Sequence, residues 1–142
     1  MPKANQMNWQ PISQIALFSS MIDTSLNDTR EHLGTLSKAK DRPHLLDDAT
    51  INRSERVHTE QMEFVDLYEQ QIRRWRAENP SAAQNTELDQ IEKENRELRA
   101  VTANVLALAP ELRKGSIDRI LEMSDLEIGL QTRLGARSSG RR

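Results

Sequence analysis

The sequence predicts an all-α protein: an antiparallel bundle of three long helices with a shorter C-terminal helical segment. Apolar residues recur at alternating spacings of three and four over three long stretches, which is the period of a helix with one buried face. The chain has only five glycines and five prolines, and the polar breaks between the stretches are short. Because short connections make consecutive helices antiparallel neighbours, a bundle is the expected architecture.

The first helix is expected at about 11–38. Pro11 suits the first helical position, where its missing N–H costs nothing. The sequence Asp41-Arg-Pro-His44 predicts a turn after the helix. The positions expected to face the core are Ile15, Ser19, Ile22, Leu26, Thr29, Leu33 and Leu36, with Ile12, Phe18 and Met21 widening the apolar stripe.

The second helix is expected at about 48–78, with Asp47 or Asp48 accepting hydrogen bonds from its free N–H groups. Arginines gather in its last turns, where they complement the helix dipole, and Asn79-Pro80 ends it. Its core-facing positions are Ile51, Ser54, His58, Gln61, Val65, Tyr68, Ile72 and Trp75.

The third helix is expected at about 82–109, introduced by the capping-box pair Ser81 and Gln84. Pro110 is expected to kink the helix or to separate it from a new one, because an interior proline removes a hydrogen bond. The core-facing positions are Leu88, Ile91, Asn95, Leu98, Thr102, Val105, Ala109 and Leu112. Four of them lie seven residues apart on a highly charged helix, which is typical of a coiled coil.

A last helical segment is expected at about 116–134, with Ser116 as its cap. We therefore expect one bundle domain over 11–134, a flexible N-terminus over 1–10, and a disordered basic tail over 135–142.

Composition narrows the functional classes. A net charge of −2 and a pI near 5.9 argue against a nucleic-acid partner, which usually requires a basic excess. No apolar run approaches the roughly 18 residues of a membrane span, so no membrane partner is expected. The chain has no cysteine, so it has neither disulfides nor a thiolate metal site, and a cytoplasmic location is expected.

One short pattern has the spacing of metal ligands. Glu55 and His58 stand three residues apart on a helix, and two such pairs with two further carboxylates hold a di-iron centre in helical bundles. Only one pair is present, and the sequence has no glycine-rich phosphate loop or nucleophile elbow. We therefore expect neither cofactor nor enzymatic activity, with a helical metalloprotein using Glu55 and His58 as an alternative.

Protein–protein interaction is the remaining class and our first hypothesis: a scaffold or regulator, forming a homodimer. The apolar face of 117–134 is broader than a thin bundle buries, so a second copy is expected to cover it. A secretion or flagellar-export type chaperone is the alternative, by analogy in size, acidity and helix content alone. The candidate interaction residues are Trp9, which lies outside every stripe, Asn95 as a buried register residue, and Ile117, Ile120, Leu121, Leu126 and Leu130.

Overall fold

The computed structural model describes residues 8–42, 45–123 and 125–126 of the 142-residue chain. They form a 3₁₀ turn, η2 (Ile12–Gln14), and three long helices: α1 (Ile15–Lys40), α2 (Asp48–Arg76) and α3 (Ala82–Lys114). Residues 117–123 are also helical, and we call residues 117–126 the C-terminal segment. The prediction of an all-helical fold is confirmed for the described residues, which contain no strand.

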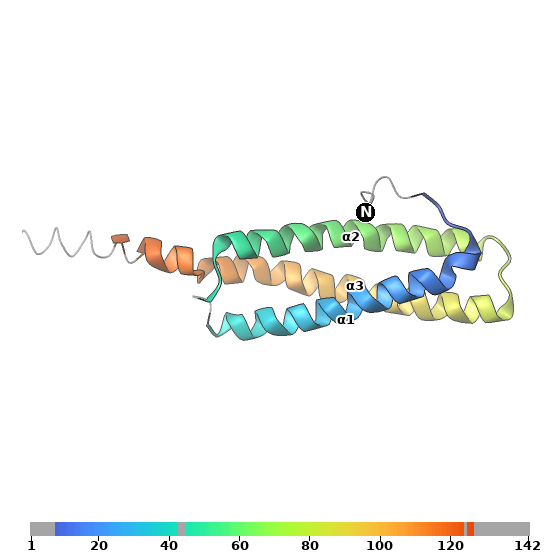
Figure 1. The fold of residues 1–142 in the computed structure, drawn as a ribbon, viewed down its shortest axis with the longest axis horizontal. Helices are drawn as coiled ribbons and strands as arrows, with labels where there is room; N and C mark the ends of the chain where they lie inside the picture. Colours follow the sequence, from blue (N-terminus) through green and yellow to red (C-terminus); the bar gives the residue numbers. More distant parts are fainter. Residues whose placement is uncertain (1–7, 43–44, 124, 127–142) are drawn as a thin grey trace, which may run out of the picture.

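The three long helices lie side by side in an elongated bundle, and α3 packs along both α1 and α2 (Figure 1). At one end, the last turn of α2 meets the residues before α1, where the indole Nε1 of Trp75 donates to the carbonyl of Gln10 at 2.9 Å. At the other end, the connection between α1 and α2 meets the residues after α3, where the N–H of Ile117 donates to the carbonyl of Leu46 at 2.7 Å.

Two helix starts follow the predicted caps. The carboxylate of Asp47 accepts the N–H of Thr50 at 2.8 Å, and the hydrogen bonds from Thr50 lower the pKa of the Asp47 carboxyl because they favour its charged form. Ser81 and Gln84 form the complete capping box, each side chain accepting the other's backbone N–H. Between these helices, Asn79 adopts a left-handed backbone with φ of 54°, a conformation that asparagine tolerates better than most residues.

Two helix boundaries differ most from the prediction, while the ends of α1 and α2 each differ from it by two residues. The chain after Pro11 first makes the tighter turn η2, with the N–H of Gln14 on the carbonyl of Pro11 at 2.9 Å, so regular α-helix begins only at Ile15. The expected end of the third helix at 109 is wrong, because α3 continues through Pro110 to Lys114. Leu112, two residues beyond the proline, is 2% exposed, and its burial favours keeping the helix intact.

The core consists of two apolar clusters, one toward each end of the bundle. The cluster near the α2–α3 connection contains the aromatic group of Phe18, Tyr68 and Trp75, with Phe18 edge-to-face on Trp75 at a centroid distance of 4.9 Å. The cluster near the α1–α2 connection is Leu36, Ala39, Ile51, Val105, Ala109 and Leu112. All eight positions predicted to face the core on the third helix are buried, which confirms that stripe.

A polar layer with one side chain from each helix separates the two clusters. The amide Nε2 of Gln61 donates to the hydroxyls of Thr29 and Thr102 at 2.9 and 2.8 Å. Each hydroxyl in turn donates to a carbonyl one turn back in its own helix, Ser25 and Leu98, at 2.6 Å. Because sliding one helix would break these bonds in the partly buried interior, the layer fixes the axial register of the three helices.

Candidate interaction surface

The C-terminal segment begins at a fixed junction on the end of the bundle. Ser116 is fully buried, and its hydroxyl donates to the carboxylate of Asp48 at 2.6 Å. The same hydroxyl accepts the N–H of Arg119 at 3.3 Å, so Ser116 caps the segment as the sequence predicted. The N–H of Asp48 donates to the carboxylate of Asp118 at 2.7 Å. The segment is therefore held to the start of α2 at its first turn.

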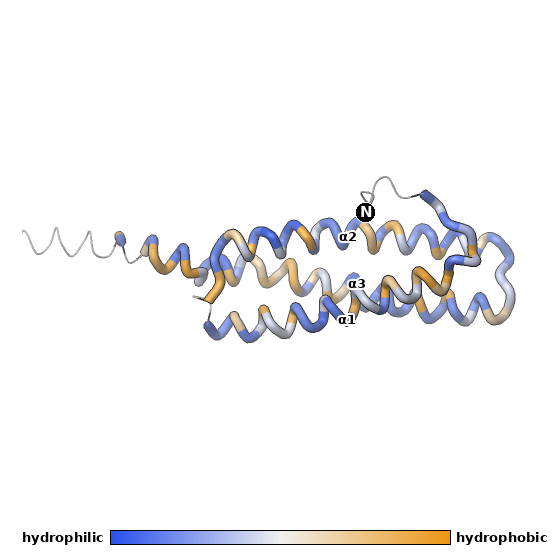
Figure 2. The backbone as a smooth tube through the Cα atoms, viewed as in Figure 1, coloured by the Kyte–Doolittle hydropathy of each residue, from blue (hydrophilic) through white to orange (hydrophobic). Residues whose placement is uncertain are grey.

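Beyond that turn, the apolar side chains of the segment are uncovered. Ile117, Ile120, Leu121, Met123 and Leu126 are between 39% and 65% exposed. The segment runs past the end of the three-helix bundle (Figure 1), and Figure 2 shows hydrophobic residues spaced along it there. The predicted surplus apolar face is thus present over the described residues; Leu130, also predicted to belong to it, lies outside them.

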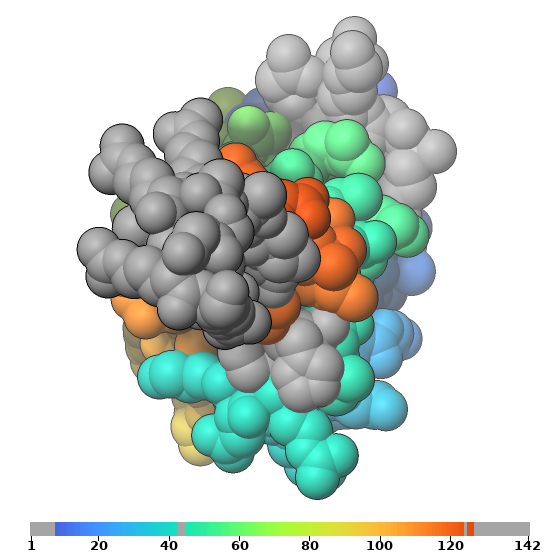
Figure 3. All heavy atoms as spheres, turned by 90° about the vertical axis from the view of Figure 1, so that its left-hand side faces the viewer, coloured from blue at the N-terminus to red at the C-terminus, as the bar shows by residue number. Residues whose placement is uncertain are grey.

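A groove separates the segment from the end of α3. Its α3 side is formed by Pro110, Arg113 and Lys114, and its other side by Arg119, Glu122, Met123 and Leu126. Figure 3 looks onto this end of the molecule, where the segment, in orange, stands beside the first residues of α2. The groove combines apolar surface with an excess of positive charge, since its lining holds three cationic side chains and the single carboxylate of Glu122.

Trp9 contacts Arg74 in the last turns of α2, whereas the C-terminal segment is held at the first turn of α2. Its ring packs under the guanidinium of Arg74 at 4.1 Å and is 39% exposed, a cation–π contact on the last turns of α2. The next residue, Gln10, is held by its backbone: its N–H donates to the side chain of Gln71 at 2.7 Å, and its carbonyl accepts from Trp75. Trp9 and Gln10 therefore form a short N-terminal strap across α2.

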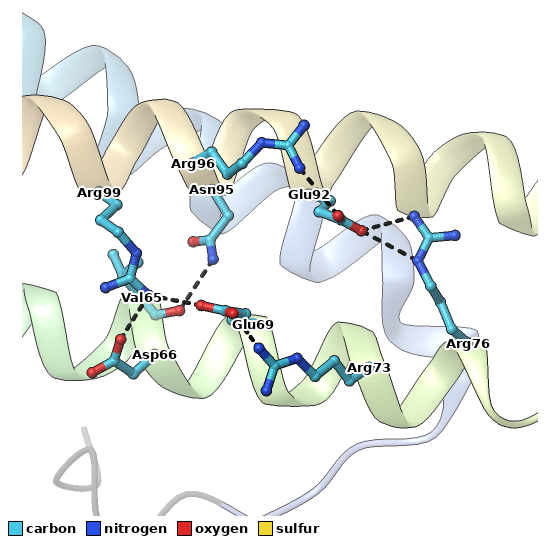
Figure 4. A network of polar contacts seen from close by, with 9 residues as sticks. All are labelled: Val65, Asp66, Glu69, Arg73, Arg76, Glu92, Asn95, Arg96 and Arg99. Carbon is cyan, nitrogen blue, oxygen red and sulfur yellow. Dashed lines mark hydrogen bonds and ion pairs between the residues drawn. The ribbon is translucent and has the colours of Figure 1, made fainter.

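Asn95 lies inside the α2–α3 seam and is 4% exposed. Its Nδ2 donates to the backbone carbonyl of Val65 at 3.1 Å, while no described residue donates to its Oδ1. Ion pairs flank it on both sides (Figure 4), from Arg99 to Asp66 at 2.6 Å and from Arg76 to Glu92 at 2.9 Å. The bond to Val65 ties α3 to α2 within one chain.

Glu55 and His58, the predicted metal-ligand pair, each contact another residue in the structure. Glu55 binds Arg113 at 3.2 Å, and the ring of His58 donates from Nδ1 to the carbonyl of Ser54 at 2.7 Å. No group of three or more histidine, aspartate or glutamate side chains is close enough to hold a metal ion anywhere in the described residues.

The structure instead places His32 against His58, a contact that was not predicted from the sequence. The two rings stack at 5.0 Å with an interplanar angle of 8°, and the Nε2 of His32 shares a 2.8 Å hydrogen bond with the hydroxyl of Ser54. The signal was present, because His32 follows Thr29 by three residues and precedes Leu36 by four. That spacing puts it on the apolar stripe of the first helix.

The histidine stack makes stability depend on pH. Burial, and secondarily the charge of His58, lower the pKa of His32 below its ordinary value of 6.5. His32 therefore binds a proton more readily in the unfolded chain than in the folded one. Its contribution to the free energy of unfolding is fully present above about pH 6.5 and is lost as the pH falls below that value. Urea unfolding at pH 7.5 and 5.5 should show a smaller loss for His32→Gln than for the wild type. Equal losses would contradict this assignment.

No protein-family model, curated protein or solved structure matches the sequence. Among the described residues, no helix has the length and apolar character needed to cross a membrane.

Proposed function

We propose that this protein is a non-enzymatic, cytoplasmic scaffold or regulator that acts through protein–protein interaction, and that it forms a homodimer through the C-terminal segment. The observation that carries the proposal is the row of five large apolar side chains that the bundle leaves exposed on a segment anchored at its first turn. Contiguous apolar surface of this kind marks interaction sites on soluble proteins.

The energies fit a weak dimer. Covering the exposed part of one large apolar side chain contributes roughly 1 kcal/mol, so covering the five of each copy contributes on the order of 10 kcal/mol. Association costs an estimated 4–15 kcal/mol in lost freedom. At the lower end of that cost about 6 kcal/mol remains, so we expect a dimer with a dissociation constant of roughly tens of micromolar.

The proposal includes an antiparallel bundle within each copy, with a coiled-coil-like seam between α2 and α3. The cross-helix bonds support it. Arg113 binds Glu55 at 3.2 Å, Arg99 binds Asp66 at 2.6 Å and Arg76 binds Asp89 at 2.6 Å, so residue numbers rise on one helix as they fall on the other.

The polar side chains between the helices support a structural rather than a catalytic role for the bundle interior. Gln61, Thr29 and Thr102 bond to one another across the three helices, and Asn95 bonds to the backbone of the neighbouring helix. Such bonds serve helix register.

Sedimentation of the full chain tests the dimer. The wild type should shift from monomer to dimer as concentration rises, and Leu121→Asp with Leu126→Asp should remain monomeric, because charges in the contact lose more solvation than they regain. The unfolding temperature at a concentration where both are monomeric should be unchanged.

Leu17→Asp is the matched control, because Leu17 is an equally exposed apolar residue on α1, far from the segment. It should dimerise like the wild type. A wild type that stays monomeric up to high micromolar concentration, or a Leu121/Leu126 variant that still dimerises, would contradict the proposal.

A further inference from the structure

The C-terminal segment and the groove beside it carry opposite charge. The segment holds three carboxylates, Asp118, Glu122 and Asp125, against the single guanidinium of Arg119. The α3 side of the groove presents Arg113 and Lys114. Each molecule thus displays an acidic apolar helix and, next to it, a basic apolar groove.

We propose that the C-terminal segment of a second copy occupies this groove, so that two copies exchange contacts reciprocally. Each acidic segment lies against the basic end of the other copy's α3. The inference rests on the proposed homodimer and names the surfaces and the chemistry that orient it.

An antiparallel pair of segments satisfies this arrangement. With the two-fold axis near Ile120, the groove-lining residues Arg119 and Glu122 of the two copies face each other across it. Positions equally far from the axis then lie opposite each other, so that residues 125–126 lie opposite the other copy's Lys114. A two-fold contact of this kind is self-complementary and closes at two copies.

Lys114 is the cation best placed to receive the partner. It is 75% exposed, and its ion pair with Glu111 is long, at 3.6 Å. Arg113 is instead held by Asn52 at 2.8 Å and Glu55 at 3.2 Å, so it shapes the groove wall. Arg119 pairs with Asp48 at 3.7 Å and Glu122 at 3.9 Å. The contact between Lys114 and Asp125 is therefore the one that should select the orientation.

Charge reversal with mixing tests the arrangement. Lys114→Glu alone places two carboxylates together at both ends of the dimer, and Asp125→Lys alone places two ammonium groups together. Each variant should dimerise roughly tenfold or more weakly than the wild type, because like charges facing each other disfavour the wrong pairing. Mixed in equal amounts, the two variants should form a heterodimer of near wild-type affinity, since both contacts are then attractive.

Lys93→Glu, an exposed reversal elsewhere on α3, is the matched control and should leave the affinity unchanged. Circular dichroism should show the same helix content for all variants. A wild type that dimerises while the reversals do not weaken it, or a mixture that does not recover affinity, overturns this inference and leaves the homodimer standing. A monomeric wild type overturns both, and the groove would then fit an acidic amphipathic helix of another protein.

Discussion

Replacing Trp75 by alanine should lower the free energy of unfolding by about 3–5 kcal/mol, the range for removing a large aromatic side chain from a packed core. Trp75 is fully buried in the apolar cluster near the α2–α3 connection, where the ring of Phe18 packs edge-to-face on it at a centroid distance of 4.9 Å. Its indole N–H also holds the carbonyl of Gln10 at 2.9 Å. The variant therefore loses apolar contacts in the core and one of the bonds that keep the N-terminal strap on α2.

Two further variants separate these contributions. Trp75→Phe keeps most of the apolar contact but removes the donor to Gln10, which should cost about 1–2 kcal/mol from the lost bond and the smaller ring. Trp9→Ala removes only the half-exposed stacking on Arg74, worth about 0.5–1 kcal/mol. Guanidinium unfolding followed by circular dichroism measures all three. A Trp75→Ala loss no larger than that of Trp9→Ala would contradict the central position of Trp75.

The helices and their inward faces could be predicted from the sequence because helix period and caps are local properties. The third helix shows this best: its spacing of three and four identified eight buried positions, including Asn95 and Thr102, and missed Val101, which is also buried. The Ser81 capping box and the Asp47 cap are set by residues three apart. Such features depend on the chain within one or two turns.

The partners of buried polar groups could not be predicted, because they come from helices far apart in the chain. Gln61 was recognised as a core-facing position, but its bonds to Thr29 and Thr102 depend on the axial offset of all three helices. The stack of His32 on His58 has the same origin. The pairing of Glu55 with Arg113 could not be predicted for a related reason, since the two residues are 58 positions apart in the chain.

The candidate interaction surface divides in the same way. The excess of apolar residues after 116 is visible in the sequence, and the structure shows those among 117–126 exposed. The groove is not visible there, because it exists only through the angle at which Ser116 and Asp48 hold the segment to the bundle. The sequence thus predicts that the apolar face after residue 116 needs a partner, but only the three-dimensional structure shows the charged groove that indicates the chemistry of that partner.

Replacing Pro110 by alanine should raise the free energy of unfolding by roughly 1–3 kcal/mol, because a proline inside a helix costs up to about 3 kcal/mol relative to alanine. The residue lies within α3, and the helix continues past it to Lys114. Proline cannot donate to the carbonyl of Leu106 four residues earlier, and alanine restores that bond. The full cost is not expected to be recovered, because the last turn of a helix is its least stable part.

Glu111→Ala is the matched control for this gain, since it adds an alanine at the neighbouring exposed position without restoring a backbone bond. It should change stability by less than about 0.5 kcal/mol. Thermal unfolding of both variants decides between two roles for Pro110. A gain for Pro110→Ala alone would show that burial of Leu112 holds the helix together despite the proline. A loss would show that the proline is needed to direct the chain from α3 toward Ser116 and the junction that carries the C-terminal segment.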